Sequence, residues 1–311
     1  MTAGSAVGDL GPMTAAASIA GGFTESERRH ILDRACAAVG LDSSGARLLR
    51  GHTNAVILLA GKPVVVKIAR RGSQLADVAR TVTLVRWLMS VGFPTVSLLP
   101  VDQPVVVDQH AVTFWTYLPQ PSDPVAAAQL AGPLYALHSL TPPLALPAHD
   151  NVRAIRRSIS AITHLPTPTV NFLSGCADRL ECELQEIDFD RQPGIIQGDP
   201  QHRNALHTQA GVVLCDWDTV SLGQPEWDLV TVEIHCRRFG HGSRHYERFA
   251  EAYGWDVMRW PGYNTLARIR ELRMITTNAR KVGHTPGSLE EVKRRIEGVR
   301  RGDTELRWRI L

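Results

Sequence analysis

Residues 195–204 read IIQGDPQHRN, and the fold can be predicted from this stretch outward. Its short apolar start ends at a Gly-Asp pair, and Asn204 follows five residues after Asp199. A second apolar run, residues 212–215, then leads directly into Asp216. We expect a loop between two buried strands that brings one carboxylate, one amide and a second carboxylate to the same cleft.

Phosphoryl transfer requires this set of groups. One carboxylate orients the attacking hydroxyl and accepts its proton, while a second carboxylate and an amide oxygen hold Mg²⁺ against the phosphates. Each acid taken alone is more simply explained as a turn or helix-cap residue. The order and spacing of Asp199, Asn204 and Asp216 favour a reaction centre instead.

The chain resembles the aminoglycoside phosphotransferase family and its relatives among choline, homoserine and methylthioribose kinases. That family carries His-Gly-Asp, an Asn at the spacing seen here, and then an Asp inside a short apolar–Asp–aromatic–acidic motif. The matching segments are 197–204, 215–218 and the Asp-Leu element within 225–229. The resemblance implies a protein-kinase-like fold of two lobes and transfer of the γ-phosphate of ATP or GTP to a hydroxyl of a small molecule.

The resemblance also implies roles for the acidic residues and Asn204. Asp199 is expected to be the catalytic base, and Asn204 and Asp216 to be the ligands of Mg²⁺. Asp228 is expected to brace the catalytic loop. Asp218 has two interpretations, either a secondary role in the site or a brace of the loop.

Two positions depart from the family pattern. Gln197 replaces the histidine before Gly-Asp, and we expect its amide to organise the loop because a carboxamide both donates and accepts hydrogen bonds. Thr81 stands where the family has a glutamate that pairs with Lys67. Asp77, one turn earlier, is either the substitute partner of Lys67 or a solvated surface residue. These departures leave a catalytically silent, kinase-like protein that binds a nucleotide or a partner as the alternative function.

The nucleotide is expected to bind near Lys67, which follows an apolar strand where a kinase needs an ammonium for the α- and β-phosphates. The preceding segment 50–54 would cover the phosphates with Thr53 and Asn54, although its single glycine also fits a simple hairpin turn. The residues after the last strand of this region are expected to form a hinge whose backbone reads the adenine: Thr116, Tyr117 and Leu118.

Periodicity and turn residues predict an α+β fold, with a small antiparallel sheet carrying one long helix followed by a larger, mostly helical region. Strands are expected at 48–49, 55–60, 63–68, 103–107 and 111–117. Helices are expected at 24–39, 73–91, 126–140, 153–162 and 170–187, and again after 226. The predicted organisation is a disordered tail (1–23), an N-terminal nucleotide-binding lobe (24–118) and a C-terminal catalytic and substrate-binding lobe (119–311).

The composition indicates the class of protein and the compartment in which we expect it. The chain is 44% hydrophobic and 21% charged, as in globular proteins, and its net charge of +3 comes from dispersed basic residues. The five cysteines are scattered and odd in number, which favours reduced thiols. No apolar stretch is long enough to cross a bilayer, and residues 1–22 lack the features of a signal peptide. We therefore expect a cytoplasmic protein that binds neither nucleic acid nor membrane.

The acceptor and the histidines are less constrained. His202 and His207 flank the loop at an unhelpful spacing, and His241 and His245 lack companion ligands nearby, so no structural zinc is expected. Aminoglycoside kinases need an acidic pocket, whereas this chain is net basic. The acceptor therefore stays open between an antibiotic, with a role in resistance, and a neutral or anionic hydroxyl metabolite. The charged run 268–273 is interpreted as an exposed helix face in preference to a lining of the cleft. The sequence does not indicate an oligomeric state.

Overall fold

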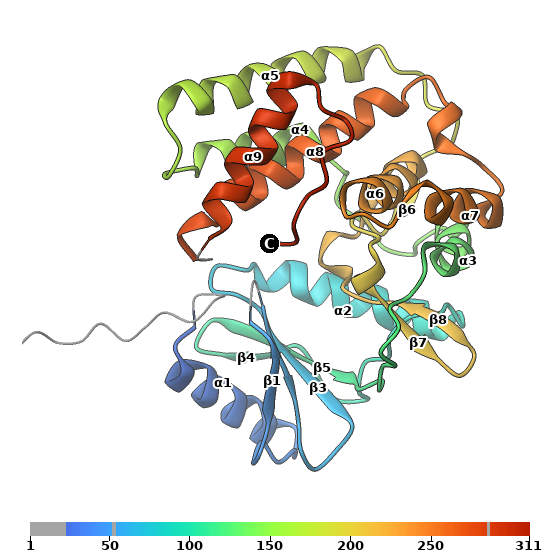
Figure 1. The fold of residues 1–311 in the computed structure, drawn as a ribbon. Helices are drawn as coiled ribbons and strands as arrows, with labels where there is room; N and C mark the ends of the chain where they lie inside the picture. Colours follow the sequence, from blue (N-terminus) through green and yellow to red (C-terminus); the bar gives the residue numbers. More distant parts are fainter. Residues whose placement is uncertain (1–22, 52–53, 285–286) are drawn as a thin grey trace, which may run out of the picture.

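The computed structural model describes residues 23–51, 54–284 and 287–311, which form a smaller part built on a sheet and a larger helical part (Figure 1). The sheet is antiparallel, with strand order β1-β2-β3-β5-β4. Its strands are β1 (Arg47–Arg50), β2 (Ala55–Leu58), β3 (Val64–Ile68), β4 (Val105–Val107) and β5 (His110–Thr116). Helix α1 (Glu25–Ala38) begins at Thr24, whose hydroxyl accepts a hydrogen bond from the Glu27 amide at 3.1 Å.

The alternation of side chains along β2 and β3 explains the inner core. Ile57, Val66 and Ile68 are buried because every second residue of a strand faces the same side. They pack with α1 and with Phe23. Lys67 lies in the middle of the sheet, opposite Val56 and Thr113 in the paired strands. The predicted tail lies outside the described residues, except for Phe23, which is buried.

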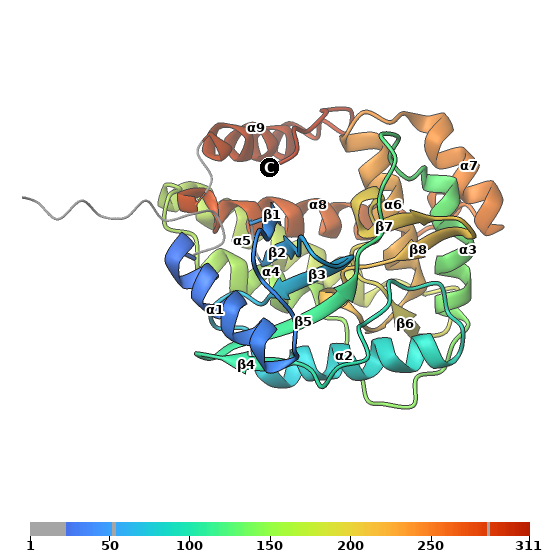
Figure 2. The same ribbon diagram turned by 90° about the horizontal axis from the view of Figure 1, so that it is seen from below.

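Helix α2 (Leu75–Ser90) packs on β5 and connects the sheet to the helical part (Figure 2). Its buried residues, such as Val85 and Leu88, belong to the larger core of the molecule rather than to the core beneath α1. The two parts of the chain therefore share a packed boundary at α2. The predicted lobe boundary at residue 118 follows β5 by two residues and stays a prediction about domain organisation.

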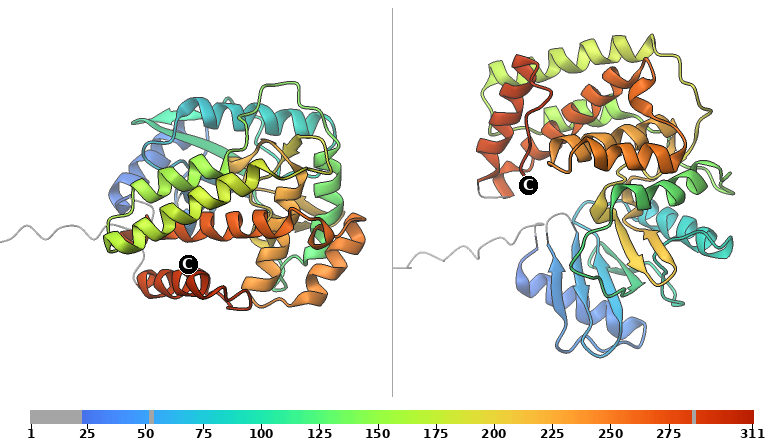
Figure 3. Two further views of the ribbon diagram at one scale, coloured as in Figure 1. Left: turned by 90° about the horizontal axis from the view of Figure 1, so that it is seen from above. Right: turned by 45° about the vertical axis from the view of Figure 1, so that its right-hand side comes forward.

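The helical part surrounds helix α8, which lies between the α4–α5 pair and α9 (Figure 3). Its helices are α3 (Ala127–His138), α4 (Asn151–Ser160), α5 (Thr167–Gln185), α6 (Pro225–Arg238), α7 (Ser243–Tyr253), α8 (Tyr263–Ala279) and α9 (Ser288–Arg301). Two short strand pairs precede α6: β6 (Gly194–Ile196) with β9 (Ser221–Gly223), and β7 (Ala205–Thr208) with β8 (Gly211–Leu214). No helix in the described ranges has both the length and the apolar character needed to span a membrane.

The predicted fold class is confirmed, with small differences at the ends of elements. The strand expected at 103–107 begins at Val105, because Gln103 is buried and its side-chain oxygen accepts a hydrogen bond from the Phe114 amide at 2.7 Å. Helix α4 begins two residues before its predicted start, because Asp150 caps it by accepting from the Arg153 amide at 2.9 Å.

Candidate active site

The loop after β6 has a backbone that only glycine fits well. Gly198 has a φ of 84°, and a Cβ at this position would lie 2.4 Å from the Thr219 carbonyl oxygen. Such a distance is far inside a van der Waals contact, so a side chain would push the loop away from the following segment. The close approach places Asp199, the next residue, at the edge of a cavity.

Asp228 forms hydrogen bonds with the backbone of this loop. It lies in the first turn of α6, fully buried, and its two carboxylate oxygens accept hydrogen bonds from the amides of Gln197 (2.7 Å) and Gly198 (2.9 Å). The His138 ring nitrogen lies 3.1 Å from the same carboxylate. A buried carboxylate needs such partners, and here they tie Asp228 to the backbone of the loop.

Gln197 joins the loop to the segment that carries Asp216. Its side-chain oxygen accepts from the Asp199 amide at 2.7 Å, and its side-chain nitrogen donates to the carbonyls of Cys215 and Asp216 at 3.1 Å each. The amide thus uses its oxygen as an acceptor and its nitrogen as a donor. The carboxamide organises the loop in the way expected at the family's histidine position.

The Asp199 carboxylate is partly exposed and has polar neighbours on both oxygens. Gln201 donates to one oxygen at 2.9 Å, and Arg270 of α8 forms an ion pair with the other. Asn204 lies at the end of the short helix η1 (His202–Asn204). Its side-chain nitrogen donates a hydrogen bond to the Asp199 carbonyl at 2.9 Å. The amide oxygen of Asn204 is then the atom that this side chain offers to a cation.

Two carboxylates from the segment after β8 contact Lys67. The Lys67 ammonium lies 2.9 Å from Asp216 and 2.8 Å from Asp218. Burial lowers the pKa of Lys67, but the two carboxylates outweigh that effect and raise it above its usual value. Burial raises the pKa of Asp216, whereas Lys67 lowers it, and the net direction is downward. Asp216 has a left-handed backbone (φ 57°), at the start of η2 (Trp217–Thr219).

Helix α2 contributes no such carboxylate within the described residues. Asp77 forms an ion pair with Arg80 at 2.9 Å instead of contacting Lys67. The Thr81 hydroxyl donates to the Asp77 carbonyl at 3.0 Å. The interpretation of Asp77 as the partner of Lys67 is therefore wrong in this structure, because Asp218 takes that place from the opposite side of the cleft.

The structure describes part of the predicted phosphate loop and all of the predicted hinge. Thr53 lies outside the described residues, whereas Asn54 donates to the Asp218 carboxylate at 2.8 Å. At the hinge, the amide of Thr116 donates to the Ser97 carbonyl at 2.9 Å and that of Tyr117 to the Pro63 carbonyl at 2.8 Å. These two amides already donate elsewhere, and the Leu118 carbonyl accepts from the Gln120 side chain at 3.0 Å, which leaves the Leu118 amide as the candidate donor to the base.

A cavity of about 940 Å³ opens beside Lys67, Asp199, Asp216 and Asp218. It extends between α2, the catalytic loop and α8. Arginines of α8 also line it, and these were missed when the run 268–273 was interpreted as an exposed face. The sequence signal that could have identified them is their spacing. Arg270, Arg273, Thr277 and Arg280 recur every three or four residues, so they share one face of the helix, and all four line the cavity.

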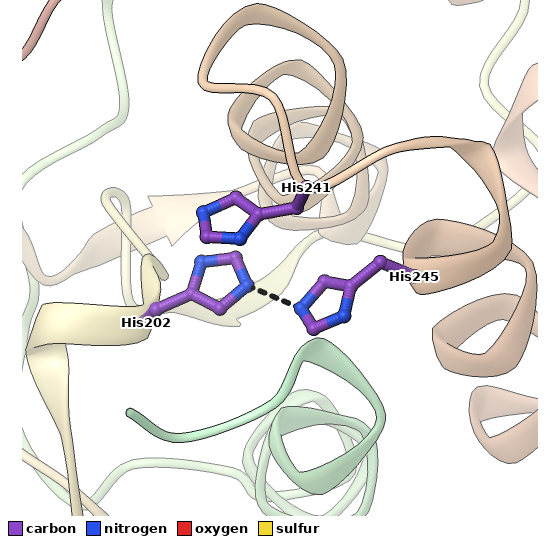
Figure 4. A group of neighbouring side chains, drawn as sticks. All are labelled: His202, His241 and His245. Carbon is purple, nitrogen blue, oxygen red and sulfur yellow. Dashed lines mark hydrogen bonds between the residues drawn. The ribbon is translucent and has the colours of Figure 1, made fainter. Parts of the chain in front are cut away.

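Three histidines gather behind the catalytic loop (Figure 4). The rings of His202, His241 and His245 are nearly parallel, and the Nε2 atoms of His202 and His245 lie 2.8 Å apart. Burial lowers the pKa of all three imidazoles. The expectation that His241 and His245 lack a further nitrogen ligand nearby is wrong, because folding brings His202 to them. The cluster joins η1 to the connection between α6 and α7, which carries His241, and to the first turn of α7, which carries His245.

Comparisons with solved structures find proteins with the same overall fold. A choline kinase from Streptococcus pneumoniae has a TM-score of 0.66 at 16% identity, over 88% of this chain and 99% of that one. A choline/ethanolamine kinase family protein from Mesorhizobium loti has a TM-score of 0.64 at 15% identity (90% and 94% covered). An amicoumacin kinase in complex with AMP-PNP, Ca²⁺ and its ligand has a TM-score of 0.69 at 12% identity (92% and 98% covered).

At these identities the solved structures establish the kinase-like fold and nothing finer. Among curated protein sequences, none matches the chain. The sequence profile of the phosphotransferase enzyme family, however, matches residues 44–271, which include the sheet, the catalytic loop and most of the helical part. The chain therefore belongs to the phosphotransferase enzyme family.

Proposed function

We propose that this protein transfers the γ-phosphoryl group of ATP or GTP to a hydroxyl group of a small molecule. One observation carries the proposal: Asp199, Asp216 and Lys67 line one cavity, and Asn204 donates a hydrogen bond to the backbone of Asp199. These side chains come from the sheet, the catalytic loop and the segment after β8. Family membership supports a phosphotransferase, and the residues present supply each group that the reaction requires.

Asp199 is the proposed catalytic base. The acceptor hydroxyl would lie against its carboxylate, and its oxygen would attack the γ-phosphorus while the bond from that phosphorus to the β-bridging oxygen breaks. The hydroxyl proton passes to Asp199, and the nucleoside diphosphate leaves. Gln201 and Arg270 hold the two carboxylate oxygens in position before the acceptor arrives, which orients the base.

The residues fit a bound Mg²⁺. Asp216 offers a carboxylate and Asn204 an amide oxygen, and oxygen ligands of this kind suit Mg²⁺, which takes the rest of its shell from water and phosphates. When bound, the ion would neutralise negative charge on the transferring group. Asp216 is already held by Lys67 at 2.9 Å, so the carboxylate is ionised and fixed for this role.

Lys67 and the loop before β2 form the proposed phosphate site. Lys67 would contact the α- and β-phosphates, while Thr53 and Asn54 cover them, and the hinge at 116–118 would read the base through its backbone. The five cysteines form no disulfide in the described structure, which is consistent with the cytoplasmic location that we propose.

Calorimetry with purified protein tests the proposal. Wild-type protein should bind ATP or GTP more tightly with Mg²⁺ than with EDTA, and Asp216→Asn should remove most of that difference. Asp102→Asn, at an exposed position outside the lining of the cavity, is the matched control. Nucleotide binding that ignores Mg²⁺ in every variant, with no turnover of any hydroxyl compound, would favour the catalytically silent alternative.

A further inference from the structure

Cationic side chains from three parts of the fold line the cavity beside the catalytic loop. Arg273, Arg280 and Lys281 come from α8 and its C-terminal end, Arg157 from α4, and Arg70 from the connection after β3. We call these five side chains the basic wall. Its members act on one another electrostatically, since Arg280 is a neighbour of both Arg157 and Arg70.

The acidic residues of the cavity do not neutralise this wall. The lining contains four carboxylates in its described part, and each has another cation as its partner. Asp77 pairs with Arg80, Asp199 with Arg270, and Asp216 and Asp218 with Lys67. Because Asp216 and Asp218 share one lysine, these pairs leave one negative charge, which is too little to cancel the four arginines of the wall.

Within the described residues, the side chains of Arg70, Arg157, Arg273 and Arg280 form no ion pair with a carboxylate. Arg273 instead donates to the Asn151 side-chain oxygen and lies 3.5 Å from His149. Both of these partners are neutral groups. Arg273 and Arg280 are partly buried, whereas Arg70 and Arg157 are exposed. A partly buried guanidinium without a counter-ion, as at Arg273 and Arg280, loses hydration and gains little in return.

The pKa values of Arg273 and Lys281 are both lowered, as expected where burial and neighbouring positive charges act together. Burial, and then Arg270, lowers the pKa of Arg273 to about 10. Burial, and then Arg280, lowers the pKa of Lys281 to about 8. An anion in the cavity would reverse both effects, because an opposite charge nearby favours the protonated form of a base.

Two simpler explanations for the gathering of these cations are the dipole of α8 and the phosphates of the nucleotide, and each explains only some of the five side chains. Cations near a helix C-terminus interact favourably with its dipole, which covers Arg280 and Lys281 but not Arg157 or Arg70, which belong to other elements. The nucleotide phosphates are anions that could also bind in this cavity. Arg273, however, lies one turn along α8 from Arg270, which pairs with the proposed base Asp199, and this places that part of the wall on the acceptor side.

We propose that the phosphoryl acceptor is an anionic hydroxyl compound, whose carboxylate or phosphate group is bound by the basic wall while its hydroxyl lies against Asp199. The inference rests on the proposed phosphotransferase function and names the substrate class for it. The same charges repel the ammonium groups of an aminoglycoside, so a polycationic antibiotic fits this cavity poorly.

Calorimetry with probes of defined charge tests the proposal directly. The probes are D-gluconate (a carboxylate), 3-phosphoglycerate (a phosphate and a carboxylate), D-glucose (neutral) and kanamycin (polycationic). The proteins are the wild type, the double variant Arg273→Gln/Arg280→Gln and the control Arg268→Gln. Arg268 lies on the same helix but pairs with Glu183 at 2.8 Å and is half exposed. Circular dichroism establishes that each variant is folded.

The wild type should bind at least one anion more tightly than glucose and kanamycin, and the double variant should lose at least tenfold in affinity while the control keeps it. The tighter of the two anions identifies the carboxylate or the phosphate as the preferred group. Failure of both anions to bind, equal binding by the wild type and the double variant, or a preference for kanamycin would each overturn the proposal.

The rate of ADP or GDP release with the same probes separates this proposal from the proposed function. Phosphorylation of kanamycin in preference to the anions would overturn the anionic acceptor and leave the phosphotransferase intact. Anion binding that depends on the wall, in a protein that phosphorylates no hydroxyl compound in a broad panel, would support the anion site and contradict the proposed reaction.

Discussion

The ammonium of Lys67 lies 2.8 Å from the carboxylate of Asp218, a residue of the helical part of the molecule. Helix α2 has Thr81 where the family pattern has a glutamate, so this carboxylate reaches Lys67 from the other side of the cleft. The site therefore keeps a paired lysine although its usual partner is missing. It also links the two parts of the chain through an ion pair.

Asp218→Asn should weaken nucleotide binding more than it slows the chemical step, because it leaves Lys67 with Asp216 alone. We expect KM for the nucleotide to rise about fivefold, the size of one partly exposed charged contact, with a smaller change in kcat. Steady-state kinetics measure both. Adding Thr81→Glu should restore part of the affinity, and an Asp218→Asn variant with unchanged KM would contradict the role.

Gln197→Ala should destabilise the fold, because it removes three hydrogen bonds from a fully buried side chain. The Asp199 amide and the carbonyls of Cys215 and Asp216 would lose their partners. The expected loss is about 2–4 kcal/mol in the free energy of unfolding, measured by urea denaturation. Gln197→His should lose less, since an imidazole can accept with one nitrogen and donate with the other. Equal losses in the two variants would count against the role of these hydrogen bonds.

Gly198→Ala should cost more stability and activity than an alanine at another glycine with the same backbone angle. Gly254 is the matched control, with a φ of 83° against 84° and no atom within 4 Å of an added Cβ. Both substitutions incur roughly 1–2 kcal/mol for the left-handed conformation, but only Gly198→Ala also meets the Thr219 carbonyl. Thermal unfolding of the two variants measures the difference. Similar losses would show that the close approach at Gly198 is unimportant.

Stability should fall on mild acidification, in part because of His149. Burial, and then Arg273, lowers its folded-state pKa from 6.5 to about 4. The unfolded chain therefore takes up this proton first, so stability is retained above about pH 6.5 and decreases as the pH falls toward 4. The contribution lost at pH 5 is roughly 2 kcal/mol.

Urea denaturation between about pH 7.5 and pH 5 measures this dependence. In His149→Gln, unfolding should take up close to one proton fewer, so the free energy of unfolding should change less steeply with pH. His164→Gln, at an exposed position, is the control for replacing a histidine. A His149→Gln slope identical to that of the wild type would contradict the assignment.

The catalytic loop was predictable from the sequence because its residues are close together in the chain. Asp199, Asn204 and Asp216 lie within 18 residues, and glycine, turn residues and apolar runs between them limit the possible backbone. The sheet was predictable for a similar reason, since each strand of this part is bounded by its own turn residues. The brace by Asp228 followed from the resemblance.

The partners of these residues were not predictable, because they come from distant parts of the chain. The pairing of Lys67 with Asp218 spans 151 residues, and no local pattern selects it over Asp77. The basic wall has the same origin: Arg268 and Arg273 lie on one helix, yet the first pairs on the surface with Glu183 and the second lines the cavity. Only the packing of α8 distinguishes them.

Phosphoryl transfer by Asp199→Asn tests the central claim most directly. The variant keeps the size and polarity of the side chain but cannot accept the hydroxyl proton. We predict that its affinity for the nucleotide with Mg²⁺ stays within about threefold of the wild type, while the rate of acceptor phosphorylation falls by about a hundredfold or more. A variant that phosphorylates the acceptor at a rate close to that of the wild type would contradict the assignment of Asp199 as the base.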